Sequence, residues 1–268
     1  MYVSWASIII ILFDMLLGLA FPIILAVVIR KKLGAAVVPF FIGMAVMVLF
    51  ALTLEQIVHS VVLGAPFGGT IRNNPYLYGF YGGFMAGLFE EGGRYLAMRF
   101  VLKKQHANRS NALMYGAGHG SIEMAILLCF GMINNLIFAL VINAGQLETL
   151  LAPLDEVTRE ALLPGIEQLC TASPLLFLVS PLERFASLAV QLALSVIVWK
   201  AAAEKGRTGY LALAFALHLL IDSVSGTLSQ LGVPVLAIEA VVYLMAAAIC
   251  GIAYRVHKTD DGCEREKA

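Results

Sequence analysis

The sequence is poor in charge and in cysteine. Only 13% of its 268 residues are charged, whereas 60% are hydrophobic and the mean hydropathy is +0.86. Soluble domains carry about 25% charged residues, so an ordinary water-soluble enzyme is excluded. Eighteen basic and eighteen acidic side chains cancel, which leaves no basic field for a phosphate backbone and excludes nucleic acid as a partner. The few cysteines follow no disulfide or metal-binding spacing: Cys129, Cys170, Cys250 and Cys263.

Long apolar runs take the place of the missing charge. A bilayer core about 30 Å thick requires roughly twenty apolar residues of helix. Seven stretches satisfy this, at 4 to 29, 37 to 62, 76 to 102, 111 to 143, 174 to 199, 209 to 229 and 233 to 256. The fold class predicted is therefore all-α, a polytopic membrane protein with about seven transmembrane helices in one bundle.

Basic residues gather in alternate loops, which predicts the orientation. Cytoplasmic loops retain Lys and Arg, and short translocated loops avoid them. The first, third and fifth loops and the tail are basic, so the N-terminus is expected outside and the C-terminus in the cytoplasm. Residues 1–256 are predicted to form a single transmembrane domain, followed by a short cytoplasmic tail at 257–268. The location expected is a plasma membrane of bacterial type.

The fourth loop, 144–173, is acidic and carries apolar residues at helical spacing. Leu147, Leu150, Leu151, Leu154, Val157 and Ala161 recur every three or four positions. Such spacing predicts an amphipathic helix at the outer interface, where it joins two spans or covers an outer opening.

Several ionisable residues lie inside the predicted spans. An ionised side chain at mid-membrane costs about 2.5 to 3.5 kcal/mol, so those present tend to face a cavity, pair or take part in chemistry. The densest set comprises Glu90, Glu91 and Arg94 in span three, His119 and Glu123 in span four, Glu183 and Arg184 in span five, and His218 and Asp222 in span six. Arg94, one turn from both glutamates, is expected to hold one of them ionised.

Three of these residues share a depth. At 1.5 Å per residue from the expected cytoplasmic ends, Glu91, His119 and His218 lie roughly 16, 12 and 14 Å into the membrane. His119 and Glu123 are four residues apart, as are His218 and Asp222, so each pair occupies one helix face. Three helices are thus expected to bring a carboxylate and two imidazoles to one point in the cytoplasmic half of the bilayer.

Two imidazoles and a carboxylate suit a catalytic Zn²⁺ with an open position, and a further glutamate can take the proton of its bound water. That arrangement predicts hydrolysis of a peptide bond. The alternative is a buried polar network that only fixes the register of the helices.

Three runs carry a resemblance to known proteins. Residues 90–94 (EEGGR), 115–119 (YGAGH) and 218–222 (HLLID) resemble the signatures of the CAAX-protease and PrsW-type intramembrane proteases. With FEEGGRY, GHGSIEM and PLERF around them, the chain more closely resembles the YhfC family of intramembrane metalloproteases, over most of its length.

The resemblance implies roles for single residues. Glu90, with Glu91 beside it, would activate water, His119 would be the middle-motif histidine, and His218 with Asp222 the last pair. Glu123 is additional to the CAAX pattern. It leaves two possibilities open: a metal bound by His119, Glu123 and His218, or hydrolysis by glutamate and oxyanion-type hydrogen bonds without a tightly held metal. The partners implied are a membrane protein or peptide as substrate and the lipid bilayer.

Two other functions fit the same residues. A proton- or cation-coupled transporter would use the carboxylates and histidines as an ion relay. A haem protein would use His119 and His218 as axial ligands, although the neighbouring carboxylates disfavour this.

The remaining features are predicted to be structural. Gly79, Gly83 and Gly87 repeat every fourth residue, which indicates a close helix crossing beside the acidic pair. Glu55 and His59 are expected to form a separate polar contact or to line an outward cavity. Glu183 and Arg184 are expected to form an ion pair or contact a substrate.

Overall fold

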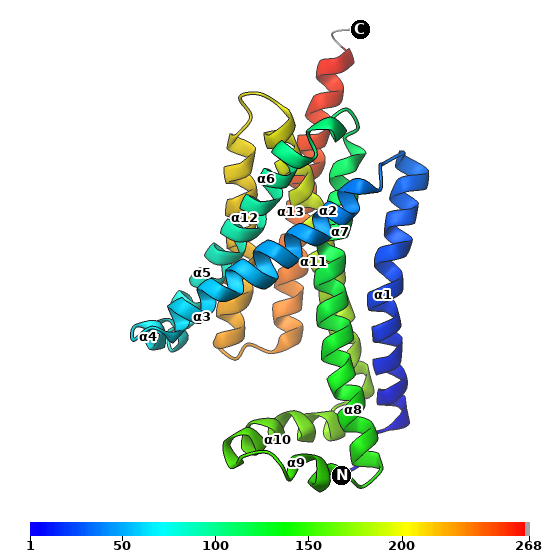
Figure 1. The fold of residues 1–268 in the computed structure, drawn as a ribbon, viewed down its shortest axis with the longest axis vertical. Coiled ribbons are helices and arrows are strands. Elements are labelled where there is room, and N and C mark those ends of the chain that lie inside the picture. The colour runs from blue at the N-terminus through cyan, green and yellow to red at the C-terminus, as the bar shows by residue number, and fades with distance from the viewer. Residues whose placement is uncertain (266–268) are drawn as a thin grey trace. The chain divides into compact units, whose positions relative to one another are not determined.

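The computed structural model describes residues 1–265, with side chains as far as residue 258, and this part of the chain is helical and contains no strand (Figure 1). The first half comprises α1 (Trp5–Leu33), α2 (Val38–Val46), η1 (Met47–Glu55), α3 (Gln56–Gly64), α4 (Gly68–Arg72), α5 (Pro75–Ala86), η2 (Gly87–Glu91), α6 (Gly92–Leu96), η3 (Ala97–Val101), η4 (Lys103–Gln105) and α7 (Ser110–Ala125). The second half comprises η5 (Ile126–Phe130), α8 (Gly131–Asn143), α9 (Leu147–Leu151), α10 (Glu156–Thr171), η6 (Pro174–Leu178), α11 (Val179–Ala203), α12 (Gly209–Gln230) and α13 (Val235–Arg265).

Six helical runs are long and apolar enough to cross a membrane. They are Trp5–Leu33, Val38–Gly64, Ser110–Asn143, Pro174–Ala203, Gly209–Gln230 and Val235–Lys258. Each coincides with one of the predicted spans, so the predicted fold class, an all-α polytopic membrane protein, is confirmed. The expected tail is helical as far as Arg265, while residues 266–268 and the side chain of Cys263 lie outside the description.

The remaining predicted span, span three at 76 to 102, is helical but is not among those six. It runs through α5, η2, α6 and η3, from Pro75 to Val101. Its glycines, tyrosines and the charged residues Glu90, Glu91 and Arg94 lower its hydropathy. Asn74 begins this run, because its side chain accepts hydrogen bonds from the backbone N–H groups of Tyr76 and Leu77 at 3.0 and 3.1 Å.

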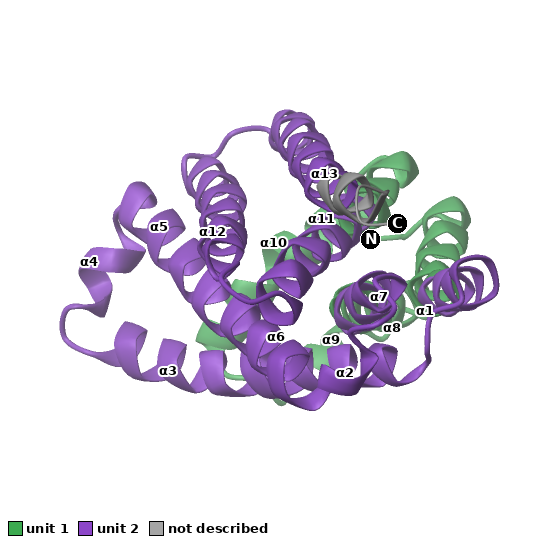
Figure 2. Cartoon of the chain, turned by 90° about the horizontal axis from the view of Figure 1, so that it is seen from above, with its two compact units in different colours: residues 1–21, 123–184 green, residues 22–122, 185–268 purple. Residues whose placement is uncertain are grey.

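The described helices cluster into two compact units (Figure 2). Unit 1 comprises Met1–Phe21 and Glu123–Arg184. Its apolar core includes Ile11, Ala139, Leu151 and Ile166, each at most 2% exposed. The predicted amphipathic loop, 144–173, lies in this unit and contains α9 and α10. Leu151 lies in the core of unit 1, whereas Val157 is 78% exposed.

Unit 2 comprises Pro22–Ile122 and Phe185–Ala268. Helix α11, from Phe185 onward, supplies more of its main core than any other helix, including Leu194, Ile197 and Val198. Helices α5 and α12 lie side by side in this unit (Figure 1). A Cβ atom added at Gly79 would meet Thr227 Oγ1 at 2.1 Å, and one at Gly83 would meet the carbonyl oxygen of Leu219 at 2.5 Å. The close crossing predicted from the glycine repeat is therefore confirmed, and it fixes the helix that leads into Glu90 and Glu91.

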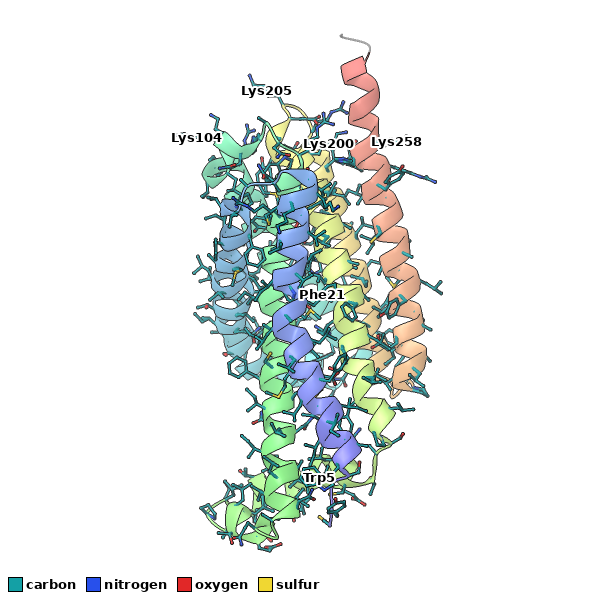
Figure 3. All side chains as sticks on the ribbon, turned by 90° about the vertical axis from the view of Figure 1, so that its right-hand side faces the viewer. Trp5, Phe21, Lys104, Lys200, Lys205 and Lys258 are labelled. Atoms are coloured by element: carbon teal, nitrogen blue, oxygen red, sulfur yellow. The ribbon has the colours of Figure 1, made fainter. Side chains whose placement is uncertain are left out.

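Basic side chains lie at one end of unit 2. Lys104, Lys200, Lys205 and Lys258 gather there in Figure 3. The direction of this end relative to a membrane, with the cytoplasm on the basic side, stays a prediction, as does the single-domain organisation of residues 1–256.

Candidate active site

Glu90 and Glu91 lie in η2, a π-helical turn between α5 and α6. π-Helical turns inside α-helices are rare and are frequent at functional sites. The two residues are 7% and 1% exposed. The turn thus holds two adjacent carboxylates in the interior of unit 2, where they require polar partners.

Glu90 is surrounded by side chains from three other helices. Its Oε2 lies 2.9 Å from Nε2 of His119 on α7 and accepts a hydrogen bond from Nε2 of Gln191 on α11, also at 2.9 Å. Nε2 of His218 on α12 is 4.0 Å from the same oxygen. A single carboxylate oxygen is therefore the point at which these helices meet.

Glu91 makes a second set of contacts. Its Oε1 lies 3.1 Å from Nη1 of Arg94 and 2.7 Å from Nδ1 of His218. The other ring nitrogen of His218 is 3.3 Å from Oδ2 of Asp222. Arg94 is fully buried and its guanidinium lies directly beside Glu91, while the expected effect on ionisation stays a prediction. His218 is held between two carboxylates and has a fixed ring orientation.

Gln191 connects these two sets of contacts and is not among the site residues predicted from the sequence. Arg94 donates a hydrogen bond to the side-chain carbonyl oxygen of Gln191. The side-chain amide N–H of Gln191 donates in turn to Glu90. Gln191 is 4% exposed and lies in an otherwise apolar stretch of α11. A lone amide in a predicted span was the available signal, because buried polar groups almost always have partners.

Close backbone contacts position His119. A Cβ atom at Gly118 would meet the carbonyl oxygen of Phe40 at 1.9 Å, and one at Gly43 would meet that of Tyr115 at 2.3 Å. These glycines allow α2 and α7 to approach closely. The ring of Tyr115 stacks near that of His119, with 6.0 Å between centroids. The imidazole is thereby fixed in a fully buried position.

Some polar atoms of this cluster have no hydrogen-bond partner among the described residues. They include His119 Nδ1, Glu91 Oε2 and Tyr115 Oη, all buried. A buried polar atom without a partner carries a desolvation penalty of about 1 to 3 kcal/mol.

A cavity of about 370 Å³ adjoins the cluster at Asp222. Glu55, His59 and Tyr81 also line it. His59 lies 3.1 Å from Glu55 Oε1 through Nε2 and 2.9 Å from the Tyr81 hydroxyl through Nδ1. The side chain of Asp222 is 40% exposed, far more than those of Glu90 and Glu91. The cavity therefore reaches the polar cluster through Asp222. Glu55 and His59 form a polar contact with each other and also line the cavity, while its opening toward the outside stays a prediction.

Glu123 belongs to unit 1, in a different setting. Its Oε1 accepts a hydrogen bond from Nη1 of Arg184 at 2.9 Å, and Arg184 also pairs with Glu183. The ion pair predicted for Glu183 and Arg184 is thus present and includes Glu123.

The side chains of the unit 2 cluster are of the types that bind zinc, but they are not arranged around a common metal position. Two imidazoles and a carboxylate are common ligands of catalytic Zn²⁺. In the part of the chain with described side chains, however, no group of three or more His, Cys, Asp or Glu residues is placed to hold a metal ion. Both imidazoles face carboxylates instead. The metal set His119, Glu123 and His218 therefore stays a prediction.

Comparison with known proteins agrees with the motifs. Residues 17–246 match the family described as YhfC intramembrane metalloprotease. The chain is also 38% identical over 229 residues to the "Uncharacterized membrane protein YhfC" of Bacillus subtilis (strain 168), covering 84% of this chain and 87% of the relative. No solved structure is significantly similar.

The helical fold and these matches define an integral membrane protein. The chain belongs to the YhfC family.

Proposed function

We propose that this protein is an intramembrane endopeptidase that uses Glu90 to activate water for hydrolysis of a peptide bond. The observation that carries the proposal is the environment of Glu90 Oε2, with His119 and Gln191 each 2.9 Å away and His218 at 4.0 Å. The name of the matched family, which includes metalloprotease, supports the same reaction class.

Glu90 serves as the general base. It takes a proton from water as the water oxygen attacks the scissile carbonyl carbon, and the proton then passes to the leaving nitrogen. Gln191 and His119 are positioning residues that orient the carboxylate. Arg94 holds Glu91, and Glu91 together with Asp222 holds His218. The cavity of about 370 Å³ beside Asp222 is the place where we expect the peptide to enter.

The proposed site also binds a zinc ion. His119 and His218 of unit 2 would hold the ion, whereas Glu123 of the predicted set belongs to unit 1 and pairs with Arg184. When bound, Zn²⁺ supplies a Lewis acid that polarises the scissile carbonyl. Metal analysis of purified wild-type protein and of a His119→Ala variant tests this part, with bound zinc expected in the wild type alone.

The substrate proposed is a membrane protein or a membrane-proximal peptide, and the location is a plasma membrane of bacterial type. The site would lie in the cytoplasmic half of the bilayer, because the basic loops are expected on that side.

The test uses the full chain reconstituted in liposomes with a mixture of detergent-extracted bacterial membrane proteins. Mass spectrometry of peptide termini is expected to show new cleavage sites with the wild type. Glu90→Gln should abolish them, whereas the exposed Glu160→Gln should not. Equal cleavage by wild type and Glu90→Gln would overturn the proposal, provided that circular dichroism shows equal helix content.

A proton or cation relay is the second candidate function. The observation in its favour is the series of titratable side chains that begins at Glu55 and His59 in the cavity and reaches His218 through Asp222. Uptake driven by a pH gradient in the same liposomes, lost in Glu55→Gln and without any new peptide termini, would favour transport over hydrolysis.

A further inference from the structure

A second pocket lies at the basic end of unit 2, apart from the acidic cluster. Its volume is about 280 Å³, and it lies between the segment before α7, the end of α11 and helix α13. Its polar lining residues are mostly basic or aromatic: His106, Arg109, Trp199, Lys200, Glu204 and His257. The acidic member, Glu204, lies 3.6 Å from Nε of Arg207, which offsets its charge.

Trp199 provides an independent indication of a ligand. The residue is 4% exposed, and its indole N–H is buried without a hydrogen-bond partner among the described residues. The ring of His106 packs against it edge to face, with centroids 5.3 Å apart, which fixes the indole. An indole nitrogen is a donor only, so the group it lacks is an acceptor such as a phosphate oxygen.

Lys200 places a cation in the interior of the same pocket. It is 5% exposed, its Nζ lies 5.1 Å from the centre of the Tyr210 ring, and it donates to the carbonyl oxygen of Val256 at 3.4 Å. An ammonium group has three N–H donors and a guanidinium has five. Lys200 and Arg109 can therefore bind an anion in addition to their contacts within the protein.

An apolar cavity continues from this pocket. It measures about 300 Å³ and shares Arg109, Val196 and His257 with the first pocket. The rest of its lining is largely hydrophobic, from α7, α11 and α13, and includes Leu113, Leu192 and Ala253. A basic pocket that leads into an apolar one matches an amphiphile with an anionic head and a hydrocarbon chain.

We propose that these two pockets bind one acidic phospholipid of the surrounding bilayer, with its phosphate near Trp199, Lys200 and Arg109 and an acyl chain in the apolar cavity. Basic pockets between transmembrane helices are suited to anionic headgroups on the cytoplasmic side. The pocket lies at the end of unit 2 where Lys104, Lys200 and Lys205 gather (Figure 3), as expected for a site at the headgroup level.

The chain offers its own reporter for the test. It has two tryptophans, Trp5 and Trp199. A Trp5→Phe variant of the full chain leaves Trp199 as the single tryptophan. In nanodiscs of phosphatidylcholine, increasing fractions of phosphatidylglycerol brominated on an acyl chain are added and the quenching of Trp199 fluorescence is measured.

Brominated phosphatidylglycerol is expected to quench at a lower mole fraction than brominated phosphatidylcholine. Lys200→Gln should raise the fraction needed for half-maximal quenching about fivefold, the contribution of one basic residue near an anionic lipid. Lys205→Gln, which changes an exposed lysine at the same end, should leave it unchanged. Arg109→Gln is the second variant if Lys200→Gln fails to fold.

Equal quenching by the two lipids would overturn the proposal, as would equal effects of Lys200→Gln and Lys205→Gln. Inorganic phosphate is also added to the quenching assay as a competitor, to distinguish a free anion from a lipid. Competition by millimolar phosphate that abolishes quenching would show a site for a free anion in place of a lipid.

Discussion

Each unit contains a cluster of charged side chains within predicted membrane spans, and the two clusters differ in composition. In unit 1, Arg184 binds the carboxylates of Glu123 and Glu183, and the side chains are between 11% and 43% exposed. In unit 2, Glu90 and Glu91 meet one guanidinium, two imidazoles and an amide in an almost fully buried network. Intramembrane charge alone therefore does not identify a site, because an ion pair can satisfy it completely.

The two clusters also differ in their unpaired polar atoms and in their access from a cavity. Buried atoms of His119 and Glu91 lack partners among the described residues, and a cavity reaches His218 through Asp222. Imidazoles exchange protons near neutral pH, whereas a guanidinium remains charged. The unit 2 cluster thus has the groups needed for acid–base chemistry, and the unit 1 cluster has the groups needed for a stable ion pair.

The largest expected effect separates the two clusters by activity. Glu90→Gln should lower the rate of peptide hydrolysis by about 100- to 10,000-fold, the usual contribution of a general base. Glu183→Gln should leave the rate within about twofold of wild type, since Glu183 lies outside the unit 2 cluster and Arg184 keeps Glu123 as a partner. Cleavage rates in liposomes measure both, and similar losses in the two variants would remove the distinction.

Removal of the central arginines should separate the clusters by stability. Arg94→Met leaves the buried Glu91 without its guanidinium, so the free energy of unfolding should fall by about 3 to 5 kcal/mol. Arg184→Met should lower the free energy of unfolding by less, because the carboxylates of Glu123 and Glu183 are 17% and 43% exposed. Unfolding in mixed detergent measures both values. A larger loss for Arg184→Met would contradict the comparison.

The close crossing of α5 and α12 should matter for the unit 2 cluster. A Cβ atom at Gly83 meets the carbonyl oxygen of Leu219 at 2.5 Å, so Gly83→Ala should destabilise the protein by about 1 to 3 kcal/mol. Gly82 is the matched control, since a Cβ there has nothing within 4 Å. Thermal unfolding in detergent should show a lower midpoint for Gly83→Ala alone. Equal unfolding midpoints for Gly83→Ala and Gly82→Ala would show that the crossing of α5 and α12 accommodates an added methyl group.

The smallest effect is expected at the surface of unit 1. Asp155 caps α10, and its carboxylate accepts hydrogen bonds from the backbone N–H and the hydroxyl of Thr158 at 2.9 and 2.8 Å. These bonds lower the pKa of Asp155 below its ordinary value. A lowered pKa in the folded state means that the carboxylate stabilises the helix at neutral pH, and that this contribution is lost as the pH falls through the folded-state pKa.

Hydrogen exchange of the first turn of α10 measures this effect. Protection should decrease slightly on acidification in the wild type, and the decrease should be absent in Asp155→Asn, which keeps the cap but cannot titrate. The same acid dependence in Asp155→Asn would contradict the assignment.

The sequence predicted the helices because each apolar span is long enough to cross a bilayer by itself. The sequence also predicted that spans three, four and six meet at the unit 2 cluster, since the depth of a residue in the membrane follows from its position along the helix. Glu91, His119 and His218 do lie in one connected network, and the glycine repeat of α5 does contact α12.

The pairing of individual side chains could not be predicted in the same way. It depends on the rotation of each helix about its axis, which residue depth does not determine. The pairing of Glu123 with Arg184 was not predicted for this reason. Gln191 joins Arg94 to Glu90, and only its own polarity marked it in the sequence. The π-helical turn at Glu90 and Glu91 also has no clear mark in the sequence.

The central claim is that Glu90 directs water onto a peptide bond, and isotope incorporation tests it most directly. Liposomes with the full chain and membrane proteins are incubated in water enriched in oxygen-18, and the new carboxyl termini are analysed by mass spectrometry. One oxygen-18 atom is expected in each new carboxyl terminus with the wild type, and no such termini are expected with Glu90→Gln. Labelled termini formed equally by both proteins, or by neither, would contradict it.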